Sequence, residues 1–128
     1  MADQEDVRRM ALALPHTREA DDHFAFSVLN KGKHKGFVWA WNERVEPGKP
    51  KIPSTSVVAV RVADQSEKEA LLASGDQTSF TERHYDDFPA VLVRLPLIDP
   101  DELRELIVDA WRCQAPRALV AAWQRGEA

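Results

Sequence analysis

Residues 99–111 carry the feature that most constrains how this chain can fold. Asp99 is suited to cap a helix, Pro100 to occupy its first position, and Glu102 its third. Apolar residues then repeat at the spacing of one helical face: Leu103, Leu106, Ile107, Ala110 and Trp111. A helix with so regular an apolar stripe has to cover another apolar layer. The rest of the chain must therefore supply a surface for it.

Alternating apolar residues predict that this surface is a β-sheet. We predict strands at 24–28, 37–41, 56–62, 80–84 and 89–95. The segment 30–36 between the first two contains Asn30, Gly32 and Gly36, which favour a tight hairpin turn. Residues 42–55 hold three prolines and a glycine, so we predict a long irregular connection there.

Three further helices complete the predicted order. Apolar spacing predicts a helix over 4–14. A second, short helix is predicted to begin after Ser66, its N-cap, and to end before Gly75. Pro116 opens a last helical stretch in which Leu119, Val120 and Trp123 share a face. The predicted fold is α+β, in the order α-β-β-β-α-β-β-α-α, with a mainly antiparallel five-stranded sheet and the N- and C-terminal helices packed against it.

Composition narrows the class of protein. With 128 residues and 44% hydrophobic residues, the chain has the size of one domain, predicted to span 1–128. No run of about eighteen apolar residues occurs, and the N-terminus is charged, so we expect a cytoplasmic protein without a membrane partner. The single cysteine, Cys113, excludes an intramolecular disulfide, and we interpret it as a small packing residue of its helix.

Several segments resemble the MmcQ/YjbR family. These are Leu14-Pro15 after the first helix, Gly32-Lys33 in the hairpin, EKEALLASGD, and LVRLPLIDPDELRELIVDAWRCQAPRAL. The resemblance covers almost the whole chain and implies a frataxin/CyaY-like α+β fold and an assignment as a DNA-binding protein with wing-like hairpins. The sequence departs from the family pattern at DDHFAF (21–26) and DDFPAV (86–91), where family members often carry tryptophan.

Positive charge is concentrated in one stretch of an acidic chain. The formal net charge is −4, yet residues 31–51 are net positive by four. Exposed lysines on a hairpin and its neighbouring loop could contact phosphates without reading sequence. The predicted DNA-binding residues are Lys31, Lys33, His34, Lys35, Arg44, Lys49 and Lys51. The alternative is that a charged tip is only solvated and prevents edge-to-edge aggregation.

Aromatic residues suggest a different class of function. Phe37, Trp39 and Trp41 alternate along one predicted strand, so we expect all three on the same face of the sheet. Under a helix they would be core residues. On an open face they would form a protein-interaction or small-ligand site, or a platform for stacked bases.

Polar clusters give weaker signals. His16, Asp21, Asp22 and His23 have the residue types of a metal site without its spacing, and acidic residues at 3, 5 and 6 are explained by the helix dipole. Residues 84–87 include histidine, tyrosine and aspartate, but no GxSxG, Walker, HExxH or GxGxxG motif accompanies them. We therefore predict no metal, no cofactor and no enzymatic activity.

Overall fold

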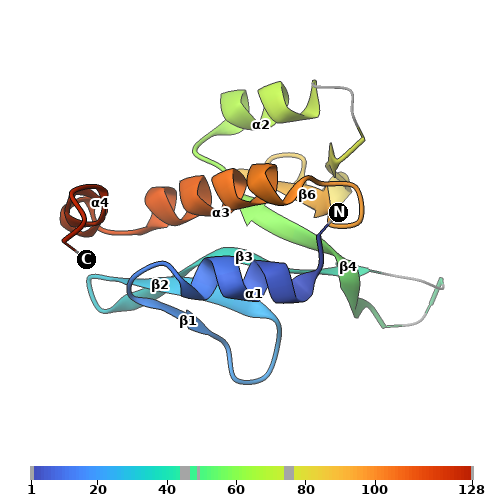
Figure 1. Ribbon diagram of the computed structural model, residues 1–128. Helices are drawn as coiled ribbons and strands as arrows, with labels where there is room; N and C mark the ends of the chain where they lie inside the picture. The colour runs from blue at the N-terminus through green and yellow to red at the C-terminus, as the bar shows by residue number, and fades with distance from the viewer. Residues whose placement is uncertain (1, 44–46, 49, 74–76, 128) are drawn as a thin grey trace.

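The part of the chain that the structure describes forms a six-stranded antiparallel sheet with four α-helices (Figure 1). The structure, a computed structural model, describes residues 2–43, 47–48, 50–73 and 77–127, with only the backbone described at Glu43 and His84. The strands are β1 (Thr17–Glu19), β2 (Ala25–Asn30), β3 (Lys33–Glu43), β4 (Ile52–Arg61), β5 (Ser79–Phe80) and β6 (Ala90–Arg94). Their order across the sheet is β1-β2-β3-β4-β6-β5. The helices are α1 (Gln4–Leu12), α2 (Gln65–Leu72), α3 (Pro100–Gln114) and α4 (Arg117–Gln124), with a 3₁₀ turn, η1, at Arg83–Tyr85.

The helices α1, α2 and α3 begin where side chains accept hydrogen bonds from free backbone amides. In α1, the Asp3 carboxylate accepts from the Asp6 amide and the Asp6 carboxylate from the Asp3 amide, which is a complete capping box. In α3, Asp99 caps the helix and Pro100 follows at its first position, as the sequence predicts. In α2 the predicted cap is wrong, because Asp64 and not Ser66 accepts from the Glu67 amide. The predicted terminator, Gly75, lies outside the described residues.

One face of the sheet is covered by α1 and α3. The fully buried Trp111 and Ile107 of α3 pack with Val58 and Val91 of the strands in one apolar cluster. The Trp111 indole N–H also donates to the Pro15 carbonyl at 3.1 Å, which satisfies its polar group where α1 gives way to β1. We call this layer the helical face. Burying each large side chain in it contributes about 1.5–3 kcal/mol.

Three details of the predicted elements are wrong. The sheet has six strands and not five, because β1, with only three residues, is too short for an alternating pattern to reveal. The strand predicted at 56–62 begins at Ile52, so the last four residues of the predicted irregular connection, 52–55, are part of β4. The strand predicted at 80–84 is the two-residue β5 followed by η1.

The predicted common face of Phe37, Trp39 and Trp41 is also wrong. Phe26 pairs with Val38 but Ser27 pairs with Gly36, so Phe37 is an extra residue in a β-bulge. The bulge reverses the alternation, and Phe37 is buried on the helical face. Trp39 and Trp41 lie on the opposite face, half-buried.

Two inferences from composition can be compared with the structure. Cys113 is exposed on α3, so the interpretation as a packing residue is wrong. Within the described part of the chain, no helix is both long and apolar enough to cross a membrane.

Candidate functional site

A tight turn brings four of the predicted site residues together. Asn30 pairs with Lys33, which leaves a two-residue loop of Lys31 and Gly32 with φ at 52° and 79°. Positive φ at both positions is the pattern of a type I′ hairpin turn. The basic tip, as we call Lys31, Lys33, His34 and Lys35, is exposed at all four residues.

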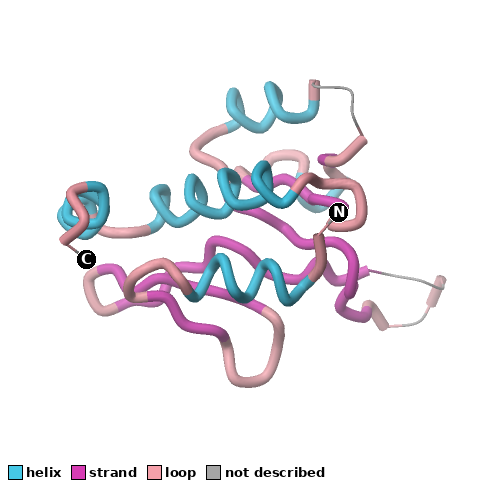
Figure 2. The backbone as a smooth tube through the Cα atoms, in the orientation of Figure 1, coloured by secondary structure: helices cyan, strands magenta, loops and turns pink. Residues whose placement is uncertain are grey.

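The end of α3 fixes the position of this hairpin. The Asn30 side-chain amide donates to the Gln114 carbonyl at 2.7 Å, and the Gln114 side-chain amide donates to the Gly36 carbonyl at 3.0 Å. The helix α4 begins at Arg117, shortly after Gln114, and Figure 2 shows this helix at the same end of the molecule as the β2–β3 hairpin. The two hydrogen bonds with Gln114 therefore fix the base of the hairpin, and its tip extends beyond them.

The lysines of the basic tip differ from half of the described arginines in their electrostatic surroundings. Five of the ten arginines that the structure describes form ion pairs with nearby carboxylates: Arg8, Arg9, Arg104, Arg112 and Arg125. Among the described residues no carboxylate pairs with Lys31, Lys33 or Lys35, nor with Arg117. Their charge is thus available to an anionic partner.

The second part of the predicted site lies elsewhere. Lys51 is exposed just before β4, where Ile52 pairs with Glu43 at the far end of β3 from the hairpin turn. Eleven residues of strand span roughly 33 Å at about 3.3 Å each. Lys51 and the basic tip therefore form two separate positive regions. Arg44 and Lys49 lie outside the described residues.

The face opposite the helices holds a smaller apolar cluster, which we call the aromatic face. Val57, Ala59 and Leu92 form its buried part, and the rings of Trp39, Trp41, Phe80 and Tyr85 pack against them. The Trp39 indole N–H donates to the Tyr85 hydroxyl at 3.2 Å, and the Trp41 ring meets Phe80 edge-on at 5.7 Å. Among the described residues, no α-helix supplies a member of this cluster. Residues 81–88 connect β5 to β6, and we call them the covering segment. Tyr85 and Phe88 in this segment contact Trp39 and cover one half of the face.

Lys68 holds the covering segment in place. It lies on α2 with only 2% of its surface exposed, and its ammonium donates to the backbone carbonyls of Tyr85, Asp86 and Phe88. Burial lowers the pKa of Lys68 below its usual range, although Asp86 and Asp87 act in the opposite direction. Sequence reasoning missed this role, because a lysine on a short helix usually lies in water.

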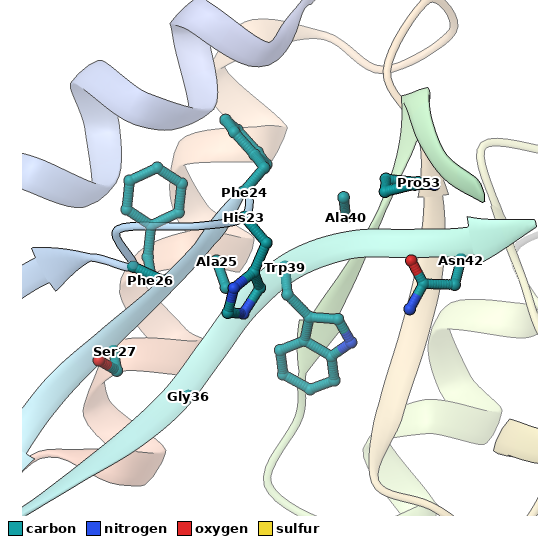
Figure 3. Close-up of a pocket in the computed structure, with 11 residues that line it drawn as sticks. His23, Phe24, Ala25, Phe26, Ser27, Gly36, Trp39, Ala40, Asn42 and Pro53 are labelled. Atoms are coloured by element: carbon teal, nitrogen blue, oxygen red, sulfur yellow. The ribbon is translucent and has the colours of Figure 1, made fainter. Parts of the chain in front are cut away.

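The other half of the aromatic face contains a cavity of about 520 Å³. Its lining comes from β2, β3, the β1–β2 connection and the start of β4: Ala20, His23, Phe24, Ala25, Phe26, Ser27, Gly36, Trp39, Ala40, Asn42 and Pro53. In Figure 3 the rings of Phe24 and Phe26 point toward the helices, whereas the Trp39 ring projects to the other side of β3. The sequence pointed to Trp39 as an aromatic candidate and to His23 as part of a possible metal cluster, but it did not group the lining residues into one site, because neighbouring strands bring them together.

The predicted polar clusters have structural partners. Asp3 and Asp6 cap α1, Glu5 pairs with Arg8, and the Asp22 carboxylate contacts the His23 ring at 2.5 Å. This contact lowers the pKa of Asp22. No group of three potential metal ligands occurs among the residues that the structure describes. Tyr85 belongs to the aromatic cluster, and the His84 side chain is not described.

Comparisons with known proteins place these features in a family context. A family model described as YjbR matches residues 12–113. Uncharacterized proteins of Mycobacterium bovis and Mycobacterium tuberculosis are each 38% identical over 132 residues, covering 96% of this chain and 96% of theirs. The crystal structure of a Deinococcus radiodurans protein with a DUF419 domain aligns with a TM-score of 0.61 at 21% identity, covering 87% of this chain and 77% of that one. This last likeness concerns the fold alone.

Proposed function

The chain belongs to the YjbR family, and we propose that within it this protein binds nucleic acid through the basic tip. The observation that carries the proposal is the contrast in charge pairing. Lys31, Lys33 and Lys35 are exposed without a carboxylate partner among the described residues, although the chain as a whole is acidic.

The geometry of the tip favours contacts with phosphates over contacts with base edges. Lysine presents a flexible point charge, whereas recognition of a base pair commonly uses the planar fork of arginine or an amide. Lys33 and Lys35 are two residues apart on β3, so their side chains leave from the same face of the hairpin. Such contacts attach a protein to the backbone with little preference for sequence.

Salt dependence tests the proposal. Fluorescence anisotropy of a labelled duplex should give a dissociation constant of roughly 10⁻⁴ to 10⁻⁶ M at physiological salt, and the affinity should be higher at low salt. The triple variant Lys31→Ala, Lys33→Ala, Lys35→Ala should make the slope of log K against log salt shallower by roughly 2 to 3, at about 0.9 per lost contact.

A matched control separates local charge from net charge. Arg9→Ala, Arg104→Ala and Arg125→Ala together remove the same number of positive charges at exposed sites that already have carboxylate partners. This control should bind like the native protein. A salt response that is flat in the native protein, or equal losses in the two triple variants, would reject the basic tip as the binding site.

A further inference from the structure

The cavity on the aromatic face has the shape of a slot for a flat ring. Its floor carries small residues, Ala25, Ser27 and Gly36, and its wall is the Trp39 indole. A Cβ added at Gly36 would lie 3.8 Å from the Trp39 ring, which is an ordinary van der Waals contact, so the glycine lets the indole pack close to the strand. An aromatic wall above a bare strand accommodates a planar ligand better than a branched one.

Contacts on its other edges hold Trp39 in one orientation. Its N–H donates to the Tyr85 hydroxyl, and its ring meets Phe88 edge-on at 6.2 Å. Tyr85 and Phe88 lie in the covering segment that Lys68 holds through their carbonyls. The indole is thus fixed before any ligand binds, which reduces the entropy cost of stacking on it.

Polar groups line the same cavity. The Ser27 hydroxyl and the Asn42 amide have no side-chain hydrogen bond to other described residues, and His23 enters from the β1–β2 connection. Together these three side chains can both donate and accept hydrogen bonds. A ring with exocyclic amino and carbonyl groups could use them, whereas a pure hydrocarbon could not.

A cation lies beside the cavity. Arg18 of β1 pairs directly with Ser27, so its exposed side chain leaves the sheet on the aromatic face. No carboxylate pairs with it among the described residues. β1 and β3 are two strand spacings apart, about 10 Å, which suits an anionic group attached to a ring stacked on Trp39.

From these observations we propose that the cavity binds a nucleobase, stacked on Trp39 and contacted by Ser27 and Asn42, with its phosphate at Arg18. The proposal deepens the proposed function and rests on it. Because a paired base lies inside the stack and cannot enter such a slot, the ligand is a single strand or a free nucleotide and not an intact duplex.

Binding of three probes tests the slot: a labelled oligothymidylate, a mononucleotide monophosphate series and the matching nucleosides. Ser27→Leu should fill the cavity and weaken oligothymidylate binding between about fivefold and a hundredfold, the range expected for one lost stacked base. Gly36→Val fills it from the neighbouring strand and serves if Ser27→Leu folds poorly. Thr55→Leu, at an exposed site on β4, controls for an added apolar side chain and should bind normally.

Two further comparisons separate the sources of the ligand and the two proposals. Arg18→Gln should weaken the monophosphates but leave nucleosides unchanged, with Arg104→Gln as the charge control. The Lys31/Lys33/Lys35→Ala variant should lose oligonucleotide and duplex affinity while keeping mononucleotide affinity. Mononucleotide binding lost with Ser27→Leu supports a free nucleotide as ligand. Loss confined to the oligonucleotide supports a single strand.

The outcomes that overturn the slot differ from those that overturn the basic tip. If single-strand binding depends on the lysines but is unchanged by Ser27→Leu and Gly36→Val in folded protein, the slot is rejected and the basic tip stands. If mononucleotides bind in the slot while the triple lysine variant keeps full oligonucleotide and duplex affinity, the proposed function at the basic tip is rejected. Absence of binding to all three probes rejects the slot. Thermal unfolding of each variant establishes that it is folded.

Discussion

Lys31 adopts a backbone conformation that lysine rarely takes. Its φ of 52° lies in the left-handed region, where the β-carbon of an L-residue crowds the backbone and costs roughly 1–2 kcal/mol. Asparagine and glycine tolerate this region better, and Asn-Gly is a preferred pair for a turn of this type. Lys31 therefore places a positive charge at a turn position where the backbone conformation favours asparagine or glycine.

Replacing Lys31 by Asn should separate stability from binding. We expect Lys31→Asn to raise the free energy of unfolding by about 0.5–1 kcal/mol, because the turn becomes easier to form. The same variant should make the salt slope of duplex binding shallower by roughly 1. Urea denaturation and anisotropy measure the two effects. A variant less stable than the native protein would show that Lys31 makes a stabilising contact at the tip.

At the scale of single elements, an ion pair connects α1 to β1 at the edge of the sheet. The Arg8 guanidinium donates to both carboxylate oxygens of Glu19 on β1, at 2.8 and 3.1 Å. The hydrogen bonds from Arg8 lower the pKa of Glu19, although partial burial opposes them. β1 has only three residues, so this pair supplies a contact that its short ladder cannot.

The pair gives the protein a predictable response to acid. A carboxyl whose pKa is lowered by folding stabilises the folded state above its unfolded pKa, near 4.5, and loses that contribution as the pH falls through the folded value. Glu19→Gln should therefore be less stable than the native protein at neutral pH, by less than about 1 kcal/mol for a partly exposed pair. The difference should shrink as the pH falls below 4.5. Urea denaturation at several pH values measures it, and a difference independent of pH would contradict this origin.

How well each element could be predicted depends on how local its cause is. The cap at Asp99 and the stripe through Trp111 are set by neighbours in the chain, and α3 matches the prediction. The bulge at Phe37 depends on how β2 and β3 pair, so alternation along β3 alone places Phe37 on the wrong face. β1 forms because its residues pair with the edge of β2, and three residues are too few to show an alternating pattern that would predict a strand.

At the scale of the whole molecule, the positive charge is divided between two ends of β3. The lysines of the basic tip are neighbours in sequence, so their grouping could be predicted. The separation of Lys51 depends on the length of β3 and could not. Arg18 beside the cavity likewise depends on the pairing of β1 with β2.

The separation predicts a dependence on duplex length. The two regions are roughly 33 Å apart, about one turn of B-form DNA, so a single duplex could contact both only if it is long enough. Lys51→Ala should weaken binding a few-fold to a duplex of about 16 base pairs but leave binding to one of about 6 base pairs unchanged. Anisotropy with both duplexes measures this. Equal effects on the two lengths would place Lys51 against the same phosphates as the tip.

The two faces of the sheet are covered by structures that differ in how they can open. Separating the helices from their face would expose the main core, so that motion amounts to global unfolding. The covering segment follows β5, which stays paired with β6. Releasing the carbonyls of Tyr85, Asp86 and Phe88 from Lys68, together with the Trp39–Tyr85 hydrogen bond, would let this segment detach while the helical side stays intact. We therefore expect the aromatic face to open partially on a faster timescale than global unfolding. Trp39 should gain mobility whenever the hydrogen bonds from Lys68 to the covering segment are broken.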